Sequence, residues 1–121
     1  MNVLIVDDDR NVLDFLKAFF ENLKHTVTIS ADPDVAIQKA VADRPDLILL
    51  DIMLPKKDGL LVLKEIKQRD PEAPIVMITA YKDAERVIEA FRLGAMDCLL
   101  KPFNLDYIVH TVLPRVVARS R

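Results

Sequence analysis

The stretch LILLDIMLPKKDG, residues 47–59, joins an uninterrupted apolar run to a polar turn. A run of aliphatic residues without polar alternation is typical of a strand that is buried on both faces, as in a parallel sheet. Four further strand-like runs occur along the chain, at residues 3–6, 26–30, 75–79 and 98–100. The run TVTIS, residues 26–30, alternates polar and apolar residues, which favours a place at the edge of the sheet.

Helix-like stretches follow each run and begin with residues that can cap a helix. The expected starts are Asp9, Asp32-Pro33, Asp58-Gly59, a position near Asp83, and Asn104. Gly94 is placed to end the fourth helix, and Pro114 is expected to kink or end the fifth. The residues expected to face the core include Val35 in the second helix and Val87, Ile88 and Phe91 in the fourth.

Five strand–helix units predict an α/β domain with a doubly wound, five-stranded parallel sheet, right-handed crossovers and helices on both faces. The 121 residues fit one such domain, residues 1–121, and the basic segment 115–121 is expected to begin a linker. No effector domain is visible in this sequence.

The composition excludes several classes of protein. Lys and Arg number 17 against 19 Asp and Glu, so we expect no direct nucleic-acid binding by charge. The single Cys98 excludes an internal disulfide and a Cys-based zinc site, and two glycines exclude a P-loop and a Rossmann fingerprint. The apolar runs are too short to span a bilayer and the first residues lack a basic secretory segment, so we expect a cytoplasmic protein without membrane contacts.

Carboxylate, hydroxyl or ammonium side chains stand at the carboxyl ends of four of the five predicted strands. Asp7 and Asp8 follow the first, Asp51 the third, Thr79 ends the fourth, and Lys101 follows the fifth. In such sheets the chemistry lies beyond the carboxyl ends of the strands. If the first and third strands are neighbours, their carboxylates repel by roughly a few kcal/mol each. Mg2+ would offset that repulsion, because hard carboxylate oxygens suit it.

This combination predicts phosphoryl transfer to a carboxylate. We assign Asp51 as the nucleophile, Asp7 and Asp8 to the metal, and Lys101 and Thr79 to the phosphoryl group. Any one Asp after a strand, taken alone, more often caps a helix, and Asp9 is given that role. What favours the chemical interpretation is that four strand ends carry the groups that one reaction requires.

The stretches VLIVDDD (3–9), LILLDIMLPKKDG (47–59), IVMITAY (75–81) and GAMDCLLKPF (94–103) resemble the receiver domain of two-component response regulators. The pattern TAY…GAMDCLLKPF looks most like receivers of transcription activators of the nitrogen-regulation type. The resemblance implies a flavodoxin-like fold with strand order 2-1-3-4-5. It implies phosphorylation of Asp51 by a sensor histidine kinase or by small phosphodonors such as acetyl phosphate. It places Mg2+ on the Asp8 and Asp51 carboxylates and the Met53 backbone carbonyl, with Asp7 acting partly through water. It also implies a cis Lys101-Pro102 bond.

The same resemblance implies a switch. Phosphorylation would rearrange the surface formed by the fourth helix, fifth strand and fifth helix, which would control an effector or homodimerisation in transcription regulation. Tyr107, Arg86 and Arg92 are candidates for that surface, although they also suit an ordinary solvated face. The domain would catalyse its own phosphorylation and dephosphorylation and turn over no external substrate, so it is not an enzyme in the usual sense.

Two residues depart from the family pattern. Cys98 stands where the family usually has Tyr or Phe, which puts the usual threonine–aromatic coupling in doubt; Tyr81 or Phe103 is a possible substitute. Lys57 stands where an apolar residue is usual, either as a solvated turn or facing an acidic partner. Met53 and Tyr81 occupy the two variable positions near the site, and neither suits holding a hydrolytic water, which predicts a long phosphoryl lifetime.

Three other functions are alternatives. A haloacid-dehalogenase-type phosphatase needs a second Asp two residues after the nucleophile, where this chain has Met53. A flavodoxin-like carrier of flavin mononucleotide needs a Ser/Thr-rich loop after the first strand, where this chain is acidic. A pseudo-receiver would bind partners without phosphate, and Cys98 is its main support.

Overall fold

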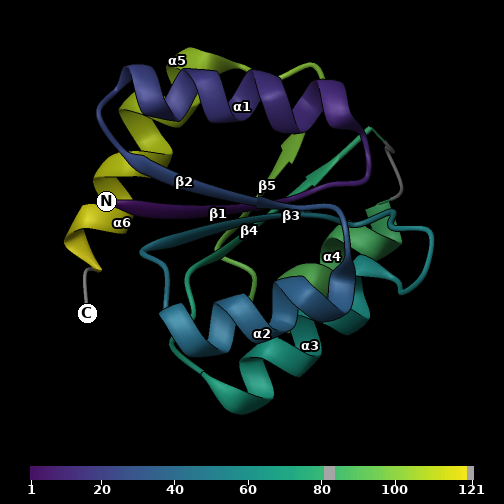
Figure 1. The fold of residues 1–121 in the computed structure, drawn as a ribbon. Helices are drawn as coiled ribbons and strands as arrows, with labels where there is room; N and C mark the ends of the chain where they lie inside the picture. The colour runs from purple at the N-terminus through teal and green to yellow at the C-terminus, as the bar shows by residue number, and fades with distance from the viewer. Residues whose placement is uncertain (81–83, 120–121) are drawn as a thin grey trace.

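The computed structural model describes residues 1–80 and 84–119. Five parallel strands form one sheet in the order β2-β1-β3-β4-β5, as the sequence predicts, and helices cover both faces (Figure 1). The strands are β1 (Asn2–Val6), β2 (Thr26–Ser30), β3 (Leu47–Asp51), β4 (Ile75–Thr79) and β5 (Asp97–Leu100). The alternating run TVTIS does lie at an edge, since β2 pairs only with β1 among the described strands.

The helices alternate with the strands along the chain. They are α1 (Arg10–Asn22), α2 (Pro33–Asp43), α3 (Gly59–Arg69), α4 (Ala84–Arg92), α5 (Leu105–Tyr107), the π-helical segment η1 (Ile108–Val112) and α6 (Leu113–Ala118). The predicted caps are confirmed where the structure describes them: Asp9, Asp32, Asp58 and Asn104 each accept a backbone N–H of the helix that follows. Asp83 and Tyr81 lie outside the described residues, so the expectations that rest on them stay untested.

The core has two halves, one on each face of the sheet. In Figure 1, α1 and α5 lie above the sheet and α2, α3 and α4 below it. Leu13, Leu16 and Phe20 of α1 fill the upper half together with Val112 and Val116. The lower half is formed by side chains of the strands, α2 and α3, and α4 contributes only Ala90 to its buried residues. The strands β1, β3 and β4 therefore contribute side chains to both halves, which explains their uninterrupted apolar runs.

The structure corrects three expectations about the helices. Val35, Ile88 and Phe91 were expected to be buried but are 41%, 50% and 47% exposed. Of the two outcomes expected at Pro114, an end of the helix does not occur: the chain continues into α6 after a π-turn in which the Leu113 N–H donates to the Ile108 carbonyl. In α2 and α4 these apolar residues lie partly outside the surface that packs against the rest of the domain.

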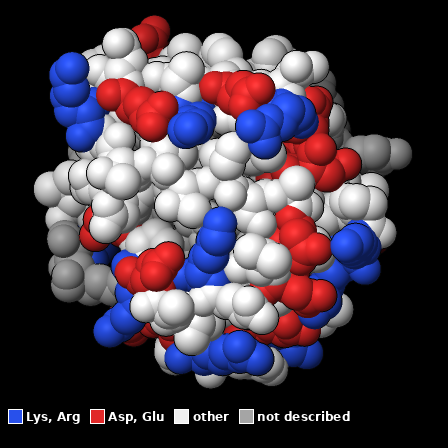
Figure 2. Space-filling view, viewed as in Figure 1, with Lys and Arg blue, Asp and Glu red and all other residues white. Residues whose placement is uncertain are grey.

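The segment 115–121 was expected to begin a linker. Its first four residues belong to α6, in which Val116 is 2% exposed, and Arg115 donates to the Met96 carbonyl at 3.0 Å. This part of the segment therefore packs with the domain. No helix among residues 1–80 and 84–119 has the length and apolarity that crossing a bilayer requires. Acidic and basic side chains lie interspersed over the face in Figure 2.

Candidate functional site at the carboxyl edge of the sheet

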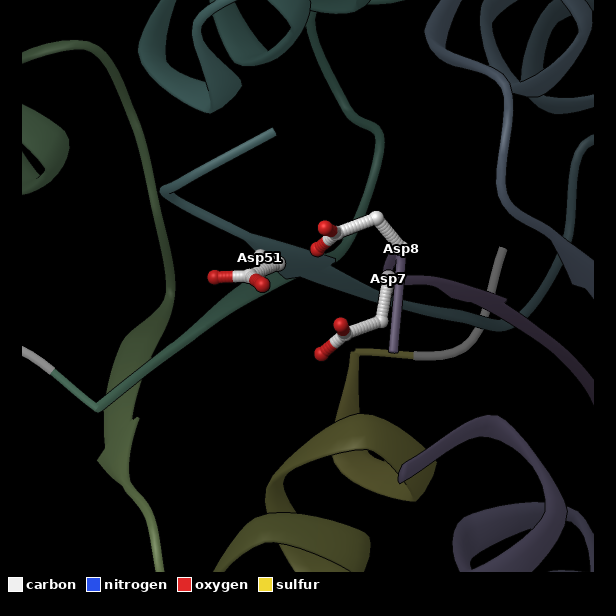
Figure 3. Close-up of side chains that lie close together, drawn as sticks. All are labelled: Asp7, Asp8 and Asp51. Atoms are coloured by element: carbon white, nitrogen blue, oxygen red, sulfur yellow. The ribbon is translucent and has the colours of Figure 1, made fainter. Parts of the chain in front are cut away.

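Three carboxylates meet at the carboxyl ends of β1 and β3. Asp7 directly follows β1, and Asp51 is the last residue of β3; the two strands pair in parallel. Asp7 is fully buried and Asp51 is 4% exposed, whereas Asp8 is exposed. One oxygen from each of the three lies within 4.8 Å of the others (Figure 3). The convergence expected from strand order is thus present in the structure.

Lys101 supplies a positive charge to this cluster from the end of β5. Its Nζ lies 2.8 Å from Asp7 Oδ2 and 3.4 Å from Asp51 Oδ2. Although burial lowers the pKa of Lys101, the carboxylates of Asp7 and Asp51 outweigh it and raise the pKa overall. The ammonium is therefore charged at neutral pH. The Lys101-Pro102 bond is cis, as the sequence resemblance implies.

The surroundings of Asp51 disfavour the charged form of its carboxyl group. Burial, and then the negative charge of Asp7, raises the pKa of the Asp51 carboxyl to about 6, against the lowering effects of the Met53 N–H and Lys101. The Met53 N–H donates to Asp51 Oδ1 at 3.1 Å and so fixes the direction of that carboxylate. A carboxyl group with a pKa this high is ionised at pH 7.5 but titrates within reach of neutral pH.

The donor set fits a divalent cation. Three carboxylates face one ammonium, which leaves an excess of negative charge in a buried place. The Asp9 N–H satisfies Asp7 Oδ1 at 2.9 Å, but a single backbone donor does not balance that charge. Oxygen ligands of this kind suit Mg2+, and the exposure of Asp8 leaves the cluster open to water and to a ligand.

Thr79 and Met53, the other two predicted site residues, lie at the same edge. Thr79 ends β4 and is 1% exposed, and its carbonyl accepts the Lys101 N–H at 2.8 Å. Its neighbour Ile78 pairs with Asp51 across the β3–β4 ladder. Met53 is 48% exposed in the loop after β3. The structure therefore brings all six predicted site residues to one edge: Asp7, Asp8, Asp51, Met53, Thr79 and Lys101.

Gly59 does more than begin α3. A Cβ on this residue would lie 2.0 Å from the Asp51 carbonyl oxygen and 2.7 Å from the Ile52 Cα. The Gly59 N–H donates to the Ile52 carbonyl at 2.8 Å. The start of α3 thus packs directly on the backbone that carries Asp51, at a distance that only glycine allows.

The loop after β3 is also held by ion pairs across long sequence separations. Lys57 Nζ lies 2.9 Å from Asp34 Oδ1 and 3.2 Å from Glu65 Oε1, so this unusual lysine pairs within the chain rather than standing in a solvated turn. Arg86 of α4 donates to the carboxylate of Asp58. Sequence reasoning missed both contacts, because nothing local marks a partner so far along the chain.

Cys98 lines an open groove where the family pattern has an aromatic residue. The groove lies between α4 and β5, measures about 360 Å³ and is lined by Ala84, Val87, Cys98 and Leu100. Burial, followed by the charge of Asp97, raises the pKa of the Cys98 thiol to about 11, so the thiol stays protonated and unreactive at neutral pH. This agrees with its interpretation as a small, partly buried apolar residue.

The two other candidates for an interaction surface differ in exposure. The Tyr107 hydroxyl donates to Asp97 Oδ2 at 2.5 Å, and Arg115 Nη1 lies 3.2 Å from the same oxygen, so Tyr107 is tied to β5. Arg92 has a largely exposed side chain, 3.9 Å from Glu89 of its own helix.

Comparison with known proteins gives one consistent result. Residues 3–113 match the family model described as the response regulator receiver domain. The chain is 37% identical over 102 residues to the alkaline phosphatase synthesis transcriptional regulatory protein PhoP of Bacillus subtilis. The aligned region covers 84% of this chain and 42% of PhoP. The chain is also 36% identical over 110 residues to the DNA-binding transcriptional regulator NtrC of Escherichia coli. That alignment covers 91% of this chain and 24% of NtrC.

The fold is equally well matched among solved structures. A CheY-like response regulator receiver domain protein from Methanospirillum hungatei superimposes with a TM-score of 0.91 at 27% identity, over 98% of this chain and 94% of that one. The chain spans less than half the length of PhoP and of NtrC. Because PhoP and NtrC are almost equally similar, identity does not separate the nitrogen-regulation type from other transcriptional regulators.

Proposed function

Because the chain belongs to the family of response regulator receiver domains, we propose that Asp51 accepts a phosphoryl group from a sensor histidine kinase with Mg2+ bound beside it. The observation that supports this most is the meeting of Asp7, Asp8 and Asp51 around one point, with the Lys101 ammonium at its border. Asp8, Asp51 and the Met53 carbonyl are the proposed ligands, with Asp7 acting partly through water. When bound, Mg2+ would neutralise charge on the phosphoryl oxygens.

The chain's own residues divide the work of the transfer. An Asp51 carboxylate oxygen attacks phosphorus, and the P–N bond of a phosphohistidine or the P–O bond of acetyl phosphate breaks, so that the leaving group takes the bonding electron pair. The Met53 N–H holds the other Asp51 oxygen in place. Lys101 stabilises the negative charge of the phosphoryl oxygens, and the Thr79 hydroxyl donates to one of them.

The phosphorylated domain would act as a conformational switch and would not convert an external substrate. A phosphoryl group adds about 1.5 to 2 negative charges at Asp51. Thr79 and the segment that follows it would respond, and the surface of α4, β5 and α5 would rearrange to control an effector or a homodimer. The domain would catalyse only its own phosphorylation and dephosphorylation. Since PhoP and NtrC are transcriptional regulators, control of transcription by a longer protein that includes this domain is the output we propose.

Beryllofluoride, a phosphoryl analogue, tests the proposal with Mg2+ present. We expect a Mg2+-dependent shift in the NMR or thermal-unfolding signal that Asp51→Asn abolishes, and mass spectrometry should find one phosphoryl group on Asp51 after incubation with acetyl phosphate. A protein that binds neither Mg2+ nor beryllofluoride would be a pseudo-receiver instead. Turnover of a phosphomonoester would favour the phosphatase alternative.

The lifetime of the phosphorylated state is a separate prediction. Met53 offers no group that could hold the attacking water, and Tyr81, outside the described residues, is expected to offer none. The acyl phosphate should therefore decay slowly for this family with Mg2+ present. Decay within seconds at room temperature would contradict this.

A further inference from the structure

Helix α4 is held in the fold by unusually little apolar burial. Among its described residues, Ala84–Arg92, only Ala90 is buried, and Ile88 and Phe91 are about half exposed. Helix α1, by contrast, buries Leu13, Leu16 and Phe20. Since apolar burial contributes most of the stability of a helix in a protein, α4 depends more than α1 on other contacts for its position.

A polar contact supplies one such attachment. Arg86 Nη2 donates to both carboxylate oxygens of Asp58, at 2.7 and 2.6 Å. The Arg86 side chain is 29% exposed and that of Asp58 is 45% exposed, so water screens the pair only in part. Asp58 also caps α3 by accepting the Leu60 N–H at 2.8 Å. One carboxylate thus joins the start of α3 to the side of α4.

Asp58 is itself fixed to the phosphoacceptor strand. The next residue, Gly59, packs so closely on Asp51 and Ile52 that no Cβ fits, and its N–H donates to the Ile52 carbonyl. The chain from Asp51 to Gly59 therefore closes on itself. Arg86 of α4 binds the Asp58 carboxylate of this loop. A movement of the loop around Asp51 would therefore act on α4 through that carboxylate.

We propose that Arg86 is a positioning residue, whose ion pair with Asp58 tethers α4 to the phosphoacceptor loop in the unphosphorylated domain. The tether opposes the rearrangement of α4. Its second consequence rests on the proposed function: removing the tether favours the activated state and so tightens the binding of a phosphoryl analogue. A partly exposed ion pair of this kind corresponds to a change of about two- to fivefold.

Two substitutions remove the tether from opposite sides. Asp58→Asn keeps the helix cap, because asparagine caps helices about as well as aspartate, but removes the charge. Arg86→Gln removes the guanidinium. Arg92→Gln is the matched control, since it removes the same charge from the same helix, where Arg92 pairs only weakly with Glu89.

Amide hydrogen exchange of the metal-free protein is the first readout. We expect α4 amides to exchange about two- to fivefold faster in Asp58→Asn and in Arg86→Gln, with α1 unchanged. The effect of the double variant should be smaller than the sum of the two single effects, because both substitutions remove the same pair. Unchanged exchange in α4, or an equal effect of Arg92→Gln, would overturn the proposal. This readout needs no phosphorylation, so it decides the tether even if Asp51 proves not to be a phosphoacceptor.

The second readout is the affinity for beryllofluoride in saturating Mg2+. Both tether variants should bind it about two- to fivefold more tightly than the original protein, and Arg92→Gln should not. Weaker or equal binding by both variants would show that the pair does not belong to the unphosphorylated state. If the original protein binds no beryllofluoride, the proposed function fails, and the exchange result stands by itself.

Discussion

The interior of the sheet and its carboxyl edge are built by the same strands with opposite kinds of side chain. In β3, residues 47–50 are aliphatic and at most 1% exposed, and the next residue is the charged Asp51. β1 runs from buried aliphatic residues into the fully buried Asp7, and β4 ends in the buried hydroxyl of Thr79. The aliphatic residues within the strands and the polar residues at their carboxyl ends are buried to a similar degree. Only the burial of the aliphatic residues favours folding.

The difference shows how stability and chemistry are separated within one strand. Burying an aliphatic side chain stabilises the fold by about 1.5–3 kcal/mol, whereas burying a carboxylate costs free energy unless partners compensate. Lys101 and the Met53 N–H compensate only in part, because the pKa of Asp51 remains raised to about 6. The interior therefore stabilises a site that, by itself, weakens the fold.

The largest expected effect comes from the interior. Phe20 of α1 is 0% exposed and stacks edge-on against Phe19, with ring centroids 5.0 Å apart. Phe20→Ala should lower the free energy of unfolding by about 3–5 kcal/mol, because it leaves a cavity in the upper core. Urea denaturation followed by circular dichroism would measure this.

Phe91→Ala in α4 is the matched control for the same chemical change. Phe91 is 47% exposed, so its removal should cost less than about 1 kcal/mol. Equal losses for Phe20→Ala and Phe91→Ala would contradict the view that α4 is held by little apolar burial.

At the carboxyl edge of the sheet, a substitution is expected to stabilise the fold instead of weakening it. Asp51→Asn should increase the free energy of unfolding at pH 7.5 without metal by up to about 3 kcal/mol, since it removes the buried charge. The Asp51 pKa is raised in the folded state, so its contribution to stability is fully present below about pH 4 and is lost as the pH rises through about 6. At pH 4 the variant should therefore show no gain.

Urea titrations of both proteins at pH 4 and pH 7.5 check this. A gain that is the same at both pH values would assign the effect to packing rather than to charge. Added Mg2+ should narrow the difference at pH 7.5, because it stabilises the folded original protein more than the variant.

Gly59→Ala tests how rigidly the edge is attached to α3. A Cβ 2.0 Å from the Asp51 carbonyl oxygen forces backbone to move, which should cost about 1–3 kcal/mol and weaken beryllofluoride binding as well. Gly94→Ala is the control: its φ of 102° makes alanine unfavourable by about 1 kcal/mol, but its nearest neighbour is the flexible Lys67 side chain. If both variants left ligand binding intact, the close packing at Gly59 would serve stability alone.

Local sequence rules predicted much of both regions. Uninterrupted aliphatic runs identified strands buried on both faces, and the residues that follow those runs identified the edge cluster. Asp9, Asp32 and Asp58 were identified as caps because a cap needs only a side-chain oxygen within two or three residues of the N–H that it accepts. These predictions succeed because each depends on neighbours in sequence or on strand order.

The errors have a different physical origin. Periodicity marked Ile88 and Phe91 as apolar positions, but burial depends on how much of the sheet lies beneath α4, which periodicity does not contain. Pro114 lacks a backbone N–H, but the helix does not end there, because one wider helical turn accommodates the missing donor. The Arg86–Asp58 pair joins residues 28 positions apart through a long side chain, and only the folded arrangement brings them together.

The smallest expected change in stability sharpens the comparison most. Asp8 is the exposed member of the acidic cluster, so Asp8→Asn should alter the free energy of unfolding by no more than about 0.5 kcal/mol without metal. The same substitution removes a proposed ligand and should weaken Mg2+ binding by about tenfold or more. Isothermal titration with Mg2+ and urea denaturation of the metal-free protein measure the two effects separately. A large loss of stability with unchanged Mg2+ affinity would mean that Asp8 supports the fold, and the edge would then not be the region in which function is separate from stability.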